Sequence, residues 1–351
     1  MGYDYAEIVP YLLHWYDRNA RILAWRENPK PYYVWVSEIM LQQTRVEAVK
    51  GYFDRFISEL PDVTALAMAS EEKLLKLWEG LGYYNRVRNM QKAAKIVVEQ
   101  FGGELPADYE ALKKLPGIGS YTAGAIASIA FGITEPAVDG NFLRVLKRIA
   151  ASYDDITKER VKKELEEDLR KIMPKDRPGD FNQSLMELGA TVCIPNGKPL
   201  CEQCPVMHLC KAFHQGCENE LPVKPQKKAR RLEDRTLFVM KKGKEECLEL
   251  ALHKRPEKGL LAGMWEIPGV DGALSLKEVQ KLFPESKIKK LPEGKHIFSH
   301  VEWRLFCYEV LLDGRDIVRK KEEETVFFTA KQIEAEISLP SAFDCCKKYL
   351  K

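Results

Sequence analysis

Hydrophobic side chains recur at every third or fourth position from the N-terminus to about residue 215. This spacing is that of one face of an amphipathic helix, and it is clearest in residues 8–16, 46–56, 74–78 and 142–149. Clusters of glycine and proline separate these segments, and no strand-like run of any length occurs among them. The pattern therefore predicts an all-α region.

The pattern changes beyond Cys217. Residues 222–231 hold five basic residues, two prolines and no acid, which is typical of a solvated linker. From Arg235 onward, alternating apolar residues predict strands at 236–240, 248–253, 301–312 and 325–329, with helices at 275–283 and 341–350. We therefore expect a helical domain over 1–217, a basic linker over 218–232 and an α+β domain over 233–351.

Length and composition agree with two globular domains. The chain has 351 residues, of which 45% are hydrophobic and 30% charged. The longest mostly apolar stretch, residues 123–133, is too short to cross a bilayer, and no basic segment precedes an apolar one at the N-terminus. We expect a soluble cytoplasmic protein without a membrane partner. The net charge of +3 gives no sign of a nucleic-acid ligand.

Four of the nine cysteines lie close together, with seven, two and five residues in the gaps between them: Cys193, Cys201, Cys204 and Cys210. Four thiolates on one loop suit either a 4Fe–4S cluster or a tetrahedral zinc ion, and the spacing alone does not favour one over the other. Basic residues around the loop favour an anionic partner. Cys217 is a possible fifth candidate, which we interpret as a spare thiol. The remaining cysteines have no metal-ligand spacing and are predicted to be small buried apolar residues: Cys247, Cys307, Cys345 and Cys346.

Residues 115–119 predict a hairpin between helical segments at 109–114 and 120–130. Gly117 and Gly119 allow a tight turn whose backbone approaches a ligand closely. Free amides at a helix that begins with Ser120 would bind a phosphate without reading base sequence. This helix–hairpin–helix pattern favours DNA-backbone binding over a purely structural turn.

Two acidic residues, Glu38 and Asp139, have sequence neighbours that indicate particular roles. Glu38 lies in an apolar run, where burial would raise its pKa, whereas the helix N-terminus that we place nearby would lower it. Asp139, just before Gly140 and Asn141, has the pattern of a helix N-cap. From spacing alone capping is the simpler interpretation of Asp139, and one residue can both cap and catalyse.

Together, the hairpin, the run Val138-Asp139-Gly140-Asn141 and the four-cysteine loop resemble the endonuclease III superfamily of DNA glycosylases. Residues 36–44 and 80–84 narrow the resemblance to the adenine DNA glycosylases of the MutY type, and the match covers nearly the whole chain. The resemblance implies a 4Fe–4S cluster in place of zinc. The family usually has six residues between its first two cysteines, and here a turn at Asn196-Gly197 would absorb the seventh.

The resemblance also implies a mechanism. Releasing adenine requires a better leaving group and a stabilised sugar cation, a task for two carboxylates. By resemblance, Glu38 protonates adenine N7 and helps to activate water. Asp139 stays ionised and supports the oxocarbenium ion, electrostatically or by covalent capture, and Asn141 orients Asp139. Tyr121 stands where relatives that also cut the backbone carry lysine, which predicts a monofunctional enzyme with Tyr121 beside the sugar.

Further residues match family positions that contact DNA once the adenine is flipped out of the stack. Arg26 and Gln183 would contact the adenine, and Trp25 would form a wall of its pocket. Gln43, Thr44 and Tyr83 would enter the duplex beside the opposing base.

Residues 263–269 resemble the start of a Nudix fold, but residues 275–282 lack the clustered glutamates that bind magnesium in Nudix hydrolases. Hydrolysis of a nucleotide is therefore not expected. By resemblance, this domain recognises 8-oxoguanine opposite the adenine, through Phe298, Ser299 and His300.

The sequence thus predicts a multidomain protein, with an all-α helix–hairpin–helix glycosylase domain and iron–sulfur loop followed by an α+β Nudix-like domain. We expect a monomeric repair enzyme, associated with the bacterial nucleoid, that removes adenine opposite 8-oxoguanine or guanine in duplex DNA. Gln183 and the second domain argue against a thymine- or uracil-directed enzyme. The Glu38/Asp139 pair argues against a nonenzymatic iron–sulfur DNA sensor, and the missing Nudix glutamates against a nucleotide hydrolase.

Overall fold

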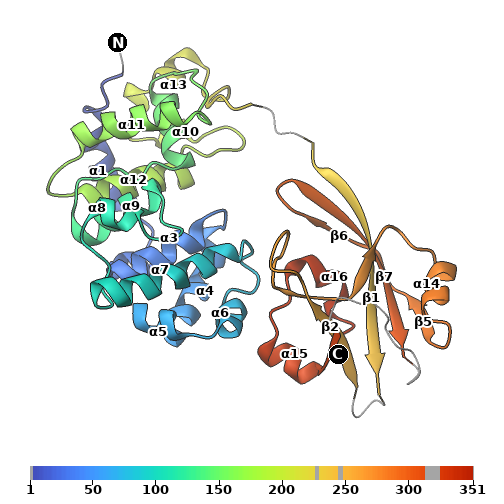
Figure 1. Ribbon diagram of the computed structural model, residues 1–351. Helices are drawn as coiled ribbons and strands as arrows, with labels where there is room; N and C mark the ends of the chain where they lie inside the picture. The colour runs from blue at the N-terminus through green and yellow to red at the C-terminus, as the bar shows by residue number, and fades with distance from the viewer. Residues whose placement is uncertain (1–2, 226–228, 244–247, 313–324, 351) are drawn as a thin grey trace. The chain divides into compact units, whose positions relative to one another are not determined.

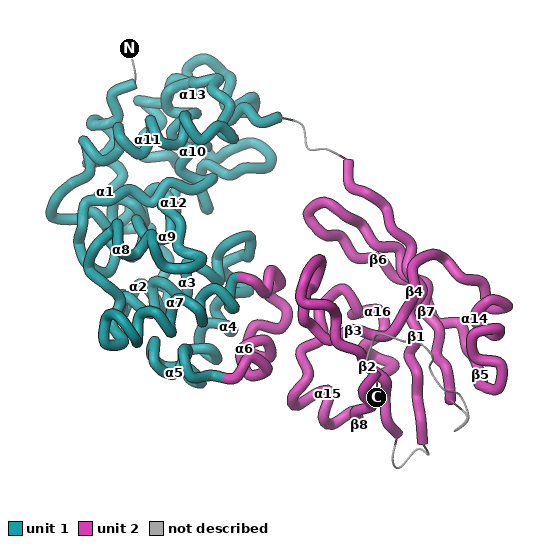
Figure 2. The backbone as a smooth tube through the Cα atoms, in the orientation of Figure 1, with its two compact units in different colours: residues 1–69, 86–226 teal, residues 70–85, 227–351 magenta. Residues whose placement is uncertain are grey.

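The computed structural model of the protein describes residues 3–225, 229–243, 248–312 and 325–350. It forms two compact units, coloured separately in Figure 2: unit 1 comprises residues 1–69 and 86–226, and unit 2 comprises residues 70–85 and 227–351. Unit 1 is helical and unit 2 contains a mixed β-sheet (Figure 1), which confirms the expected fold class.

Unit 1 is built from short and medium helices joined by tight turns. They are α1 (Ile8–Asn19), α2 (Ala24–Glu27), α3 (Pro31–Leu41), α4 (Val46–Glu59), α5 (Val63–Met68), α7 (Asn85–Phe101), α8 (Tyr109–Lys113), α9 (Ser120–Phe131), α10 (Gly140–Ile149), α11 (Glu159–Ile172), α12 (Pro178–Thr191) and α13 (Lys211–Gln215). The 3₁₀ turns η1 (Cys201–Gln203) and η2 (Met207–Leu209) precede α13.

Helices α3 and α9 pack against each other in the interior of unit 1. Both are apolar around much of their circumference, and nearly every residue from Tyr32 to Met40 and from Thr122 to Ser128 is buried. A helix that is apolar on all sides must be covered on all sides. The few polar side chains that these two helices carry are consequently held in a dry environment.

Unit 2 contains strands β1 (Arg231–Lys242), β2 (Glu249–Lys254), β3 (Trp265–Glu266), β4 (Gly269–Asp271), β5 (Lys287–Lys290), β6 (Gly294–Ile297), β7 (Val301–Leu311) and β8 (Thr325–Thr329). Its helices are α6 (Glu71–Leu77), α14 (Leu276–Leu282), α15 (Ala330–Glu336) and α16 (Asp344–Lys347), with the 3₁₀ turn η4 (Ser341–Phe343). The sheet order is β3-β2-β1-β7-β5, with β4 beside β1, β6 beside β7 and β8 beside β2. Strands β1 and β7 are parallel, and the other pairs are antiparallel.

Side chains of β1 and β7 alternate between two hydrophobic cores, one on each face of the sheet. Leu237 and Cys307 contribute to one core, whereas Phe238 and Tyr308 contribute to the other. This alternation is the signal by which the strands were predicted. The structure starts β1 at Arg231 instead of Thr236, and it contains β3 to β6, which are too short to be seen as a pattern in the sequence.

Residues 70–85 belong to unit 2, an association that the sequence analysis does not predict. Lys76 Nζ donates to the carbonyl oxygen of Ile337 at 3.0 Å, and Lys347 Nζ lies 3.1 Å from a carboxylate oxygen of Glu79. These bonds join α6 and the turn after it to the C-terminal part of the chain.

Among the described residues, no helix combines the length and the apolar character that a membrane crossing requires.

Candidate active site and cysteine loop

Glu38 of α3 and Tyr121 of α9 are joined by a hydrogen bond in which the tyrosine hydroxyl donates to a carboxyl oxygen. Glu38 is only 5% exposed. Its burial raises the pKa of its carboxyl group to about 7, although the Tyr121 hydroxyl opposes this effect. The Asp139 charge raises the pKa of Glu38 further, so the two carboxyl groups lie within electrostatic reach of each other. A carboxyl group in this state can donate a proton near neutral pH.

The position of Glu38 within its helix differs from the prediction. The sequence pattern predicts a helix N-terminus near Glu38, but α3 begins at Pro31 and Glu38 lies in its last turn. That prediction is wrong because proline at the first helical position starts the helix seven residues before Glu38. Near a helix C-terminus the dipole disfavours a carboxylate, so it acts in the same direction as burial.

Asp139 is the N-cap of α10, as the pattern of its neighbours suggests. Its Oδ1 accepts hydrogen bonds from the backbone amides of Asn141 at 2.8 Å and Phe142 at 2.9 Å, and its Oδ2 accepts one from Asn141 Nδ2 at 2.8 Å. Burial raises the pKa of Asp139, and the three donors oppose this shift. The carboxylate is therefore fixed in one orientation by the residue predicted to orient it.

Arg144 connects this carboxylate to the cysteine loop. Its Nη2 donates to the Asn141 side-chain oxygen at 2.8 Å and to the Gly189 carbonyl oxygen at 2.7 Å, while its Nε donates to the Cys193 carbonyl oxygen at 2.8 Å. A continuous chain of hydrogen bonds thus runs from Asp139 through Asn141 and Arg144 to Cys193.

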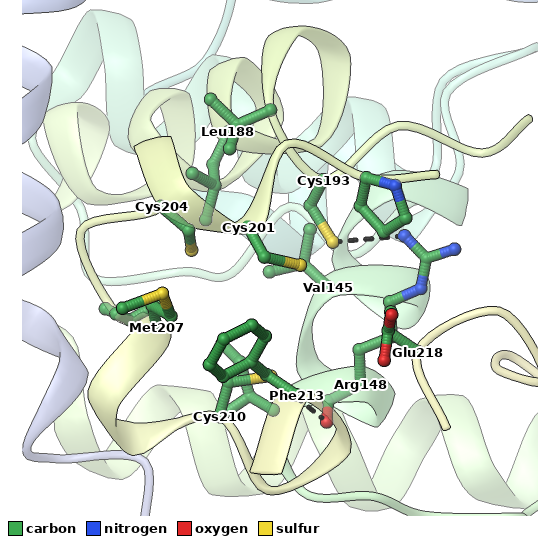
Figure 3. A pocket seen from close by; sticks show the side chains of 14 residues that line it. Val145, Arg148, Leu188, Cys193, Cys201, Cys204, Met207, Cys210, Phe213 and Glu218 are labelled. Carbon is green, nitrogen blue, oxygen red and sulfur yellow. Dashed lines mark hydrogen bonds between the residues drawn. The ribbon is translucent and has the colours of Figure 1, made fainter. Parts of the chain in front are cut away.

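The four cysteines predicted as ligands line one pocket, and Figure 3 shows their sulfur atoms around a shared space: Cys193, Cys201, Cys204 and Cys210. The other lining residues are mostly apolar. Arg148 Nη1 donates to Cys193 Sγ at 3.3 Å, which would balance part of the charge of four thiolates. Four sulfur donors, an apolar wall and a cationic donor to sulfur fit a metal or iron–sulfur centre.

The segment between Cys193 and Cys201 forms a loop whose two ends lie close together. The Leu200 amide donates to the Val192 carbonyl oxygen at 3.0 Å, so the intervening residues loop out between two neighbouring points. Gly197 has φ of +79°, and a Cβ atom there would have nothing within 4 Å, as expected for the glycine of an open turn. The turn at Asn196-Gly197 can therefore absorb the additional residue without displacing Cys201.

The hairpin between α8 and α9 has the predicted location. Gly117 has φ of +78°, and a Cβ atom there would lie 2.9 Å from Asn89 Cβ, so this position requires glycine. Gly119, with φ of −90°, is the N-cap of α9 and has open space where a Cβ would be. Ser120 begins α9, and its hydroxyl accepts a hydrogen bond from Lys162 Nζ at 2.9 Å. A cation therefore lies beside the free amides of this helix.

Arg26 forms an ion pair with a buried acid of α12, the helix that also carries Gln183, and this acid was not among the predicted site residues. Glu187 is fully buried, and its carboxylate accepts from Arg26 Nη2 at 2.7 Å and from Arg21 Nη2 at 3.0 Å. Gln183 precedes Glu187 by one turn of α12 and is 9% exposed, so the two share a helix face. Trp25 is buried next to Arg26 in α2.

The turn after α3 is held in a strained conformation. Gln43 is exposed and has φ of +60°, a region that residues other than glycine rarely adopt. Arg86 Nη1 donates to the carbonyl oxygens of Ile39 and Gln42, both at 2.7 Å, and so fixes the end of α3. Thr44 follows with its hydroxyl turned back to the Gln42 carbonyl oxygen at 3.4 Å.

In unit 2, residues 298–300 form the tip of the hairpin between β6 and β7. The Phe298 amide donates to the Val301 carbonyl oxygen at 2.8 Å, and the Phe298 ring packs on Trp303 with 4.8 Å between ring centroids. Ser299 and His300 are exposed. Phe298 therefore anchors the tip, and the next two side chains project from it.

Tyr83 is also strained, with φ of +49°, and it is half exposed. Its hydroxyl lies 3.0 Å from the Ser299 hydroxyl, within unit 2. The structure thus brings together two residues for which the sequence analysis predicts different roles.

Four buried or partly buried charged residues with clear structural roles were missed by the sequence analysis: Arg86, Arg144, Lys162 and Glu187. The sequence contains only a weak signal for the roles of these four residues. Arg144 and Glu187 each occupy a position between apolar neighbours in a helix, which is unusual for a charged residue without a partner.

Comparisons with known proteins agree with this architecture. Residues 36–171 match the family model described as HhH-GPD superfamily base excision DNA repair protein, and residues 236–348 match the NUDIX domain. Among solved structures, a thermostable thymine-DNA glycosylase is 28% identical with a TM-score of 0.53, covering 60% of this chain and 96% of its own. A trapped endonuclease III–DNA covalent intermediate is 27% identical with a TM-score of 0.51, covering 60% of this chain and 98% of its own. Fold and site together define a base-excision DNA glycosylase of the helix–hairpin–helix superfamily.

Curated relatives narrow the class. The adenine DNA glycosylase of Rattus norvegicus is 38% identical, with 89% of this chain and 72% of the relative aligned, and that of Homo sapiens is 37% identical, with 89% and 69% aligned. The corresponding protein of Buchnera aphidicola subsp. Schizaphis graminum is 35% identical, with 82% and 83% aligned. The chain belongs to the adenine DNA glycosylases, enzymes of base excision repair that hydrolyse an N-glycosyl bond.

Proposed function

We propose that this protein removes adenine paired with 8-oxoguanine, or with guanine, from duplex DNA, and that it does so without cutting the DNA backbone. The observation that carries the proposal is the buried Glu38, whose pKa of about 7 suits a proton donor and whose carboxyl group lies within electrostatic reach of Asp139.

In the proposed first step, Glu38 gives its proton to N7 of the flipped adenine. The bond between C1′ of the sugar and N9 breaks, and its electron pair goes to the base, which leaves as neutral adenine. The sugar carries the resulting positive charge, and the Asp139 carboxylate stabilises it electrostatically. The Asn141 and Phe142 donors hold that carboxylate toward one orientation throughout the step.

In the second step, a water molecule attacks C1′ and passes a proton to the Glu38 carboxylate. This proton transfer restores the acid and leaves an abasic sugar. The Tyr121 hydroxyl, which donates to Glu38, would hold the carboxyl group in place while its proton leaves and returns.

Adenine recognition is assigned to Arg26 and Gln183, with Trp25 as a wall of the pocket. A glutamine amide can pair with one donor and one acceptor on the adenine edge. The ion pair between Arg26 and the buried Glu187 supports this assignment, because it fixes the arginine near the helix face that also carries Gln183.

The open amides before α9 are proposed to bind a DNA phosphate, with Gly117, Gly119 and Ser120 forming the contact and Lys162 adding positive charge. Gln43, Thr44 and Tyr83 are proposed to enter the duplex and fill the space that the flipped base leaves. The left-handed conformations of Gln43 and Tyr83 support this role, because such strain persists mainly at functional sites.

Recognition of 8-oxoguanine is assigned to Phe298, Ser299 and His300. The hydroxyl and imidazole groups at the exposed hairpin tip can detect the altered donor and acceptor pattern of the oxidised base. The hydrogen bond between Ser299 and Tyr83 supports the assignment, since it would pre-position the serine hydroxyl beside a residue that enters the duplex.

The cysteine pocket is proposed to hold a 4Fe–4S cluster on Cys193, Cys201, Cys204 and Cys210. When bound, the cluster would supply a rigid cross-link of the loop. The Cys193 carbonyl oxygen of this loop accepts a hydrogen bond from Arg144 of α10, which also donates to Asn141. We further propose that the enzyme is a monomer in which residues 1–217 cut, residues 218–232 link and residues 233–351 recognise the lesion.

The proposal is tested with duplexes that carry adenine opposite 8-oxoguanine, guanine or cytosine, and thymine opposite guanine, under single-turnover conditions. We expect adenine release that is fastest opposite 8-oxoguanine, strand breaks only after hot alkali, and no covalent adduct with borohydride because position 121 carries no amine. Release of thymine, or breaks without alkali, would contradict the proposal. Equimolar iron and acid-labile sulfide are expected in the purified protein, and a fully active protein with zinc alone would refute the cluster assignment.

A further inference from the structure

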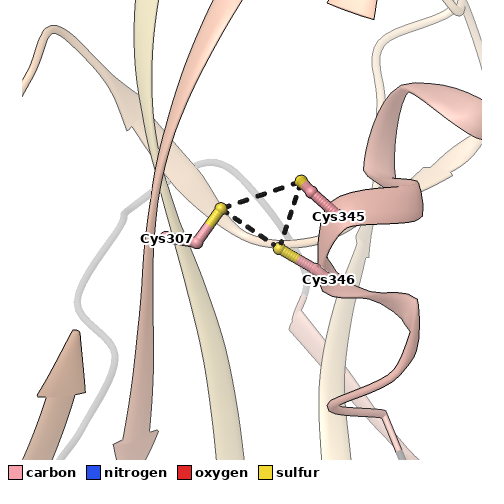
Figure 4. A group of neighbouring side chains, drawn as sticks. All are labelled: Cys307, Cys345 and Cys346. Carbon is pink, nitrogen blue, oxygen red and sulfur yellow. Dashed lines mark hydrogen bonds between the residues drawn. The ribbon is translucent and has the colours of Figure 1, made fainter. Parts of the chain in front are cut away.

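Three cysteines that are far apart in the sequence meet in unit 2. Cys307 lies on β7, whereas Cys345 and Cys346 lie on α16 (Figure 4). The sulfur atoms of Cys307 and Cys346 are 3.3 Å apart, and each lies 3.8 Å from the sulfur of Cys345. The three ligand atoms could hold one metal ion.

The distances between the three sulfur atoms agree with those in a tetrahedral zinc centre. Thiolates about 2.3 Å from a tetrahedral zinc ion lie about 3.8 Å from one another. Two of the three sulfur pairs already have this separation, and only Cys307 and Cys346 would have to move apart slightly. Soft thiolate donors prefer zinc to the oxygen-seeking ions magnesium and calcium.

The strand that faces the three cysteines leaves space for the Cys345 side chain. A Cβ atom on Gly294 would lie 2.6 Å from Cys345 Cβ and 2.8 Å from its sulfur, so the strand facing Cys345 carries glycine where any larger residue would displace the sulfur. Cys307 and Cys346 are fully buried, whereas Cys345 is partly exposed. The exposed side provides an entry path for an ion and a position for a water molecule as fourth ligand.

We propose that Cys307, Cys345 and Cys346 form a zinc site that fixes α16 to strand β7, distinct from the cysteine pocket of unit 1. Phe343, just before α16, packs in the same core as Trp303, which in turn contacts Phe298 of the hairpin tip. Zinc at this site therefore stabilises the side of the sheet that carries residues 298–300, because a ligand that binds only the folded state stabilises it.

The test uses the full chain with its unit 1 cysteine pocket loaded as purified and with iron content measured in every sample. Zinc is titrated against a competing chelator, and bound zinc, accessible thiols and the thermal unfolding midpoint are measured. We expect one equivalent of zinc, protection of three thiols and a higher midpoint. Cobalt in place of zinc should give a sulfur-to-metal charge-transfer band.

Cys345→Ser removes one ligand at the partly exposed position and should weaken zinc binding by roughly 100-fold or more, since even outer-shell changes cost 10–100-fold. Cys217→Ser is the matched control, because it removes a thiol from unit 1 and should leave this zinc affinity unchanged. Gly294→Ala keeps all three sulfur atoms but displaces Cys345, so it should weaken binding as well, whereas Gly51→Ala, with nothing near its Cβ position, should not.

Two results would overturn the proposal. One is zinc binding that is equal in the wild type and in Cys345→Ser. The other is a disulfide between Cys307 and Cys346 in the protein isolated without reductant, detected by mass spectrometry, that persists in place of bound zinc.

Discussion

Glu38 and Asp139 are held by hydrogen bonds inside unit 1, whereas Ser299 and His300 stand exposed on a hairpin tip in unit 2. The carboxyl groups owe their altered pKa values to burial, and hydrogen bonds fix their orientation. The backbone of the tip is held by its own turn, by Arg230 Nε, which donates to the Phe298 carbonyl oxygen at 3.2 Å, and by the Arg231 amide, which donates to the His300 carbonyl oxygen at 3.0 Å, whereas the Ser299 and His300 side chains are exposed. The difference teaches that the proposed chemistry depends on a rigid, dry environment, whereas the proposed lesion recognition depends on accessible side chains. Substitutions in the two regions should therefore change different measured quantities.

The largest effect is expected at the proposed acid. Glu38→Gln keeps the shape of the side chain but cannot supply a proton, so single-turnover adenine release should fall by about 10²–10⁴-fold. Binding to the lesion duplex should persist. At pH 8 the variant should be at least as stable as the wild type, because a buried charge has been removed. Loss of folding or of DNA binding together with activity would show that Glu38 has a structural role instead.

Asp139→Asn separates catalysis from helix capping. Asparagine caps a helix about as well as aspartate, so the free energy of unfolding should change little. Adenine release should fall by about 10²–10³-fold because the stabilising charge is lost. Asp108→Asn changes the N-cap of α8 in the same way and should leave adenine release unchanged. Equal activity in the two variants would reduce Asp139 to a cap.

Gly117→Ala tests the proposed phosphate contact. The substitution strains a positive φ and pushes against Asn89, which should reorient the amides before α9 and weaken DNA affinity by roughly tenfold, since a hydrogen bond to a charged group contributes about 1.5–3 kcal/mol. Gly132→Ala is the control: it strains a similar φ at the other end of α9 without any steric neighbour. If both variants lose affinity equally in a binding titration, the hairpin has no specific role.

The smallest effect is expected at the hairpin tip. Ser299→Ala removes a hydroxyl from an exposed turn and should reduce the preference for adenine opposite 8-oxoguanine over adenine opposite guanine by about 2- to 10-fold, the value of one ordinary hydrogen bond. The rate on the guanine mispair serves as the internal control and should hardly change. Equal losses on both duplexes would contradict the separation of lesion recognition from chemistry.

Features that depend on neighbouring residues could be predicted from the sequence. The hairpin at 115–119, the cap at Asp139 and the grouping of the four cysteines of residues 193–210 depend on short segments, where the spacing of residues restricts the geometry. Helix boundaries were harder to predict. Because α3 starts at Pro31, the helix dipole acts on the pKa of Glu38 in the opposite direction to the one expected.

Features that depend on distant residues could not be predicted. Cys307, Cys345 and Cys346 lack any ligand spacing and were interpreted as buried apolar residues, yet the packing of α16 on β7 brings their sulfur atoms together. Arg144 likewise shows no motif, because its partners Asn141, Gly189 and Cys193 converge only in the folded chain. Cys247 lies outside the described residues.

The pH dependence of the chemical step tests the central claim most directly, namely that Glu38 acts as a protonated acid. Single-turnover release of adenine should be measured with enzyme in excess on a duplex with adenine opposite 8-oxoguanine. Because the raised pKa keeps Glu38 protonated below about pH 7, the rate constant should decline as the pH rises above 7. A rate constant that instead increased through pH 7 would contradict the account.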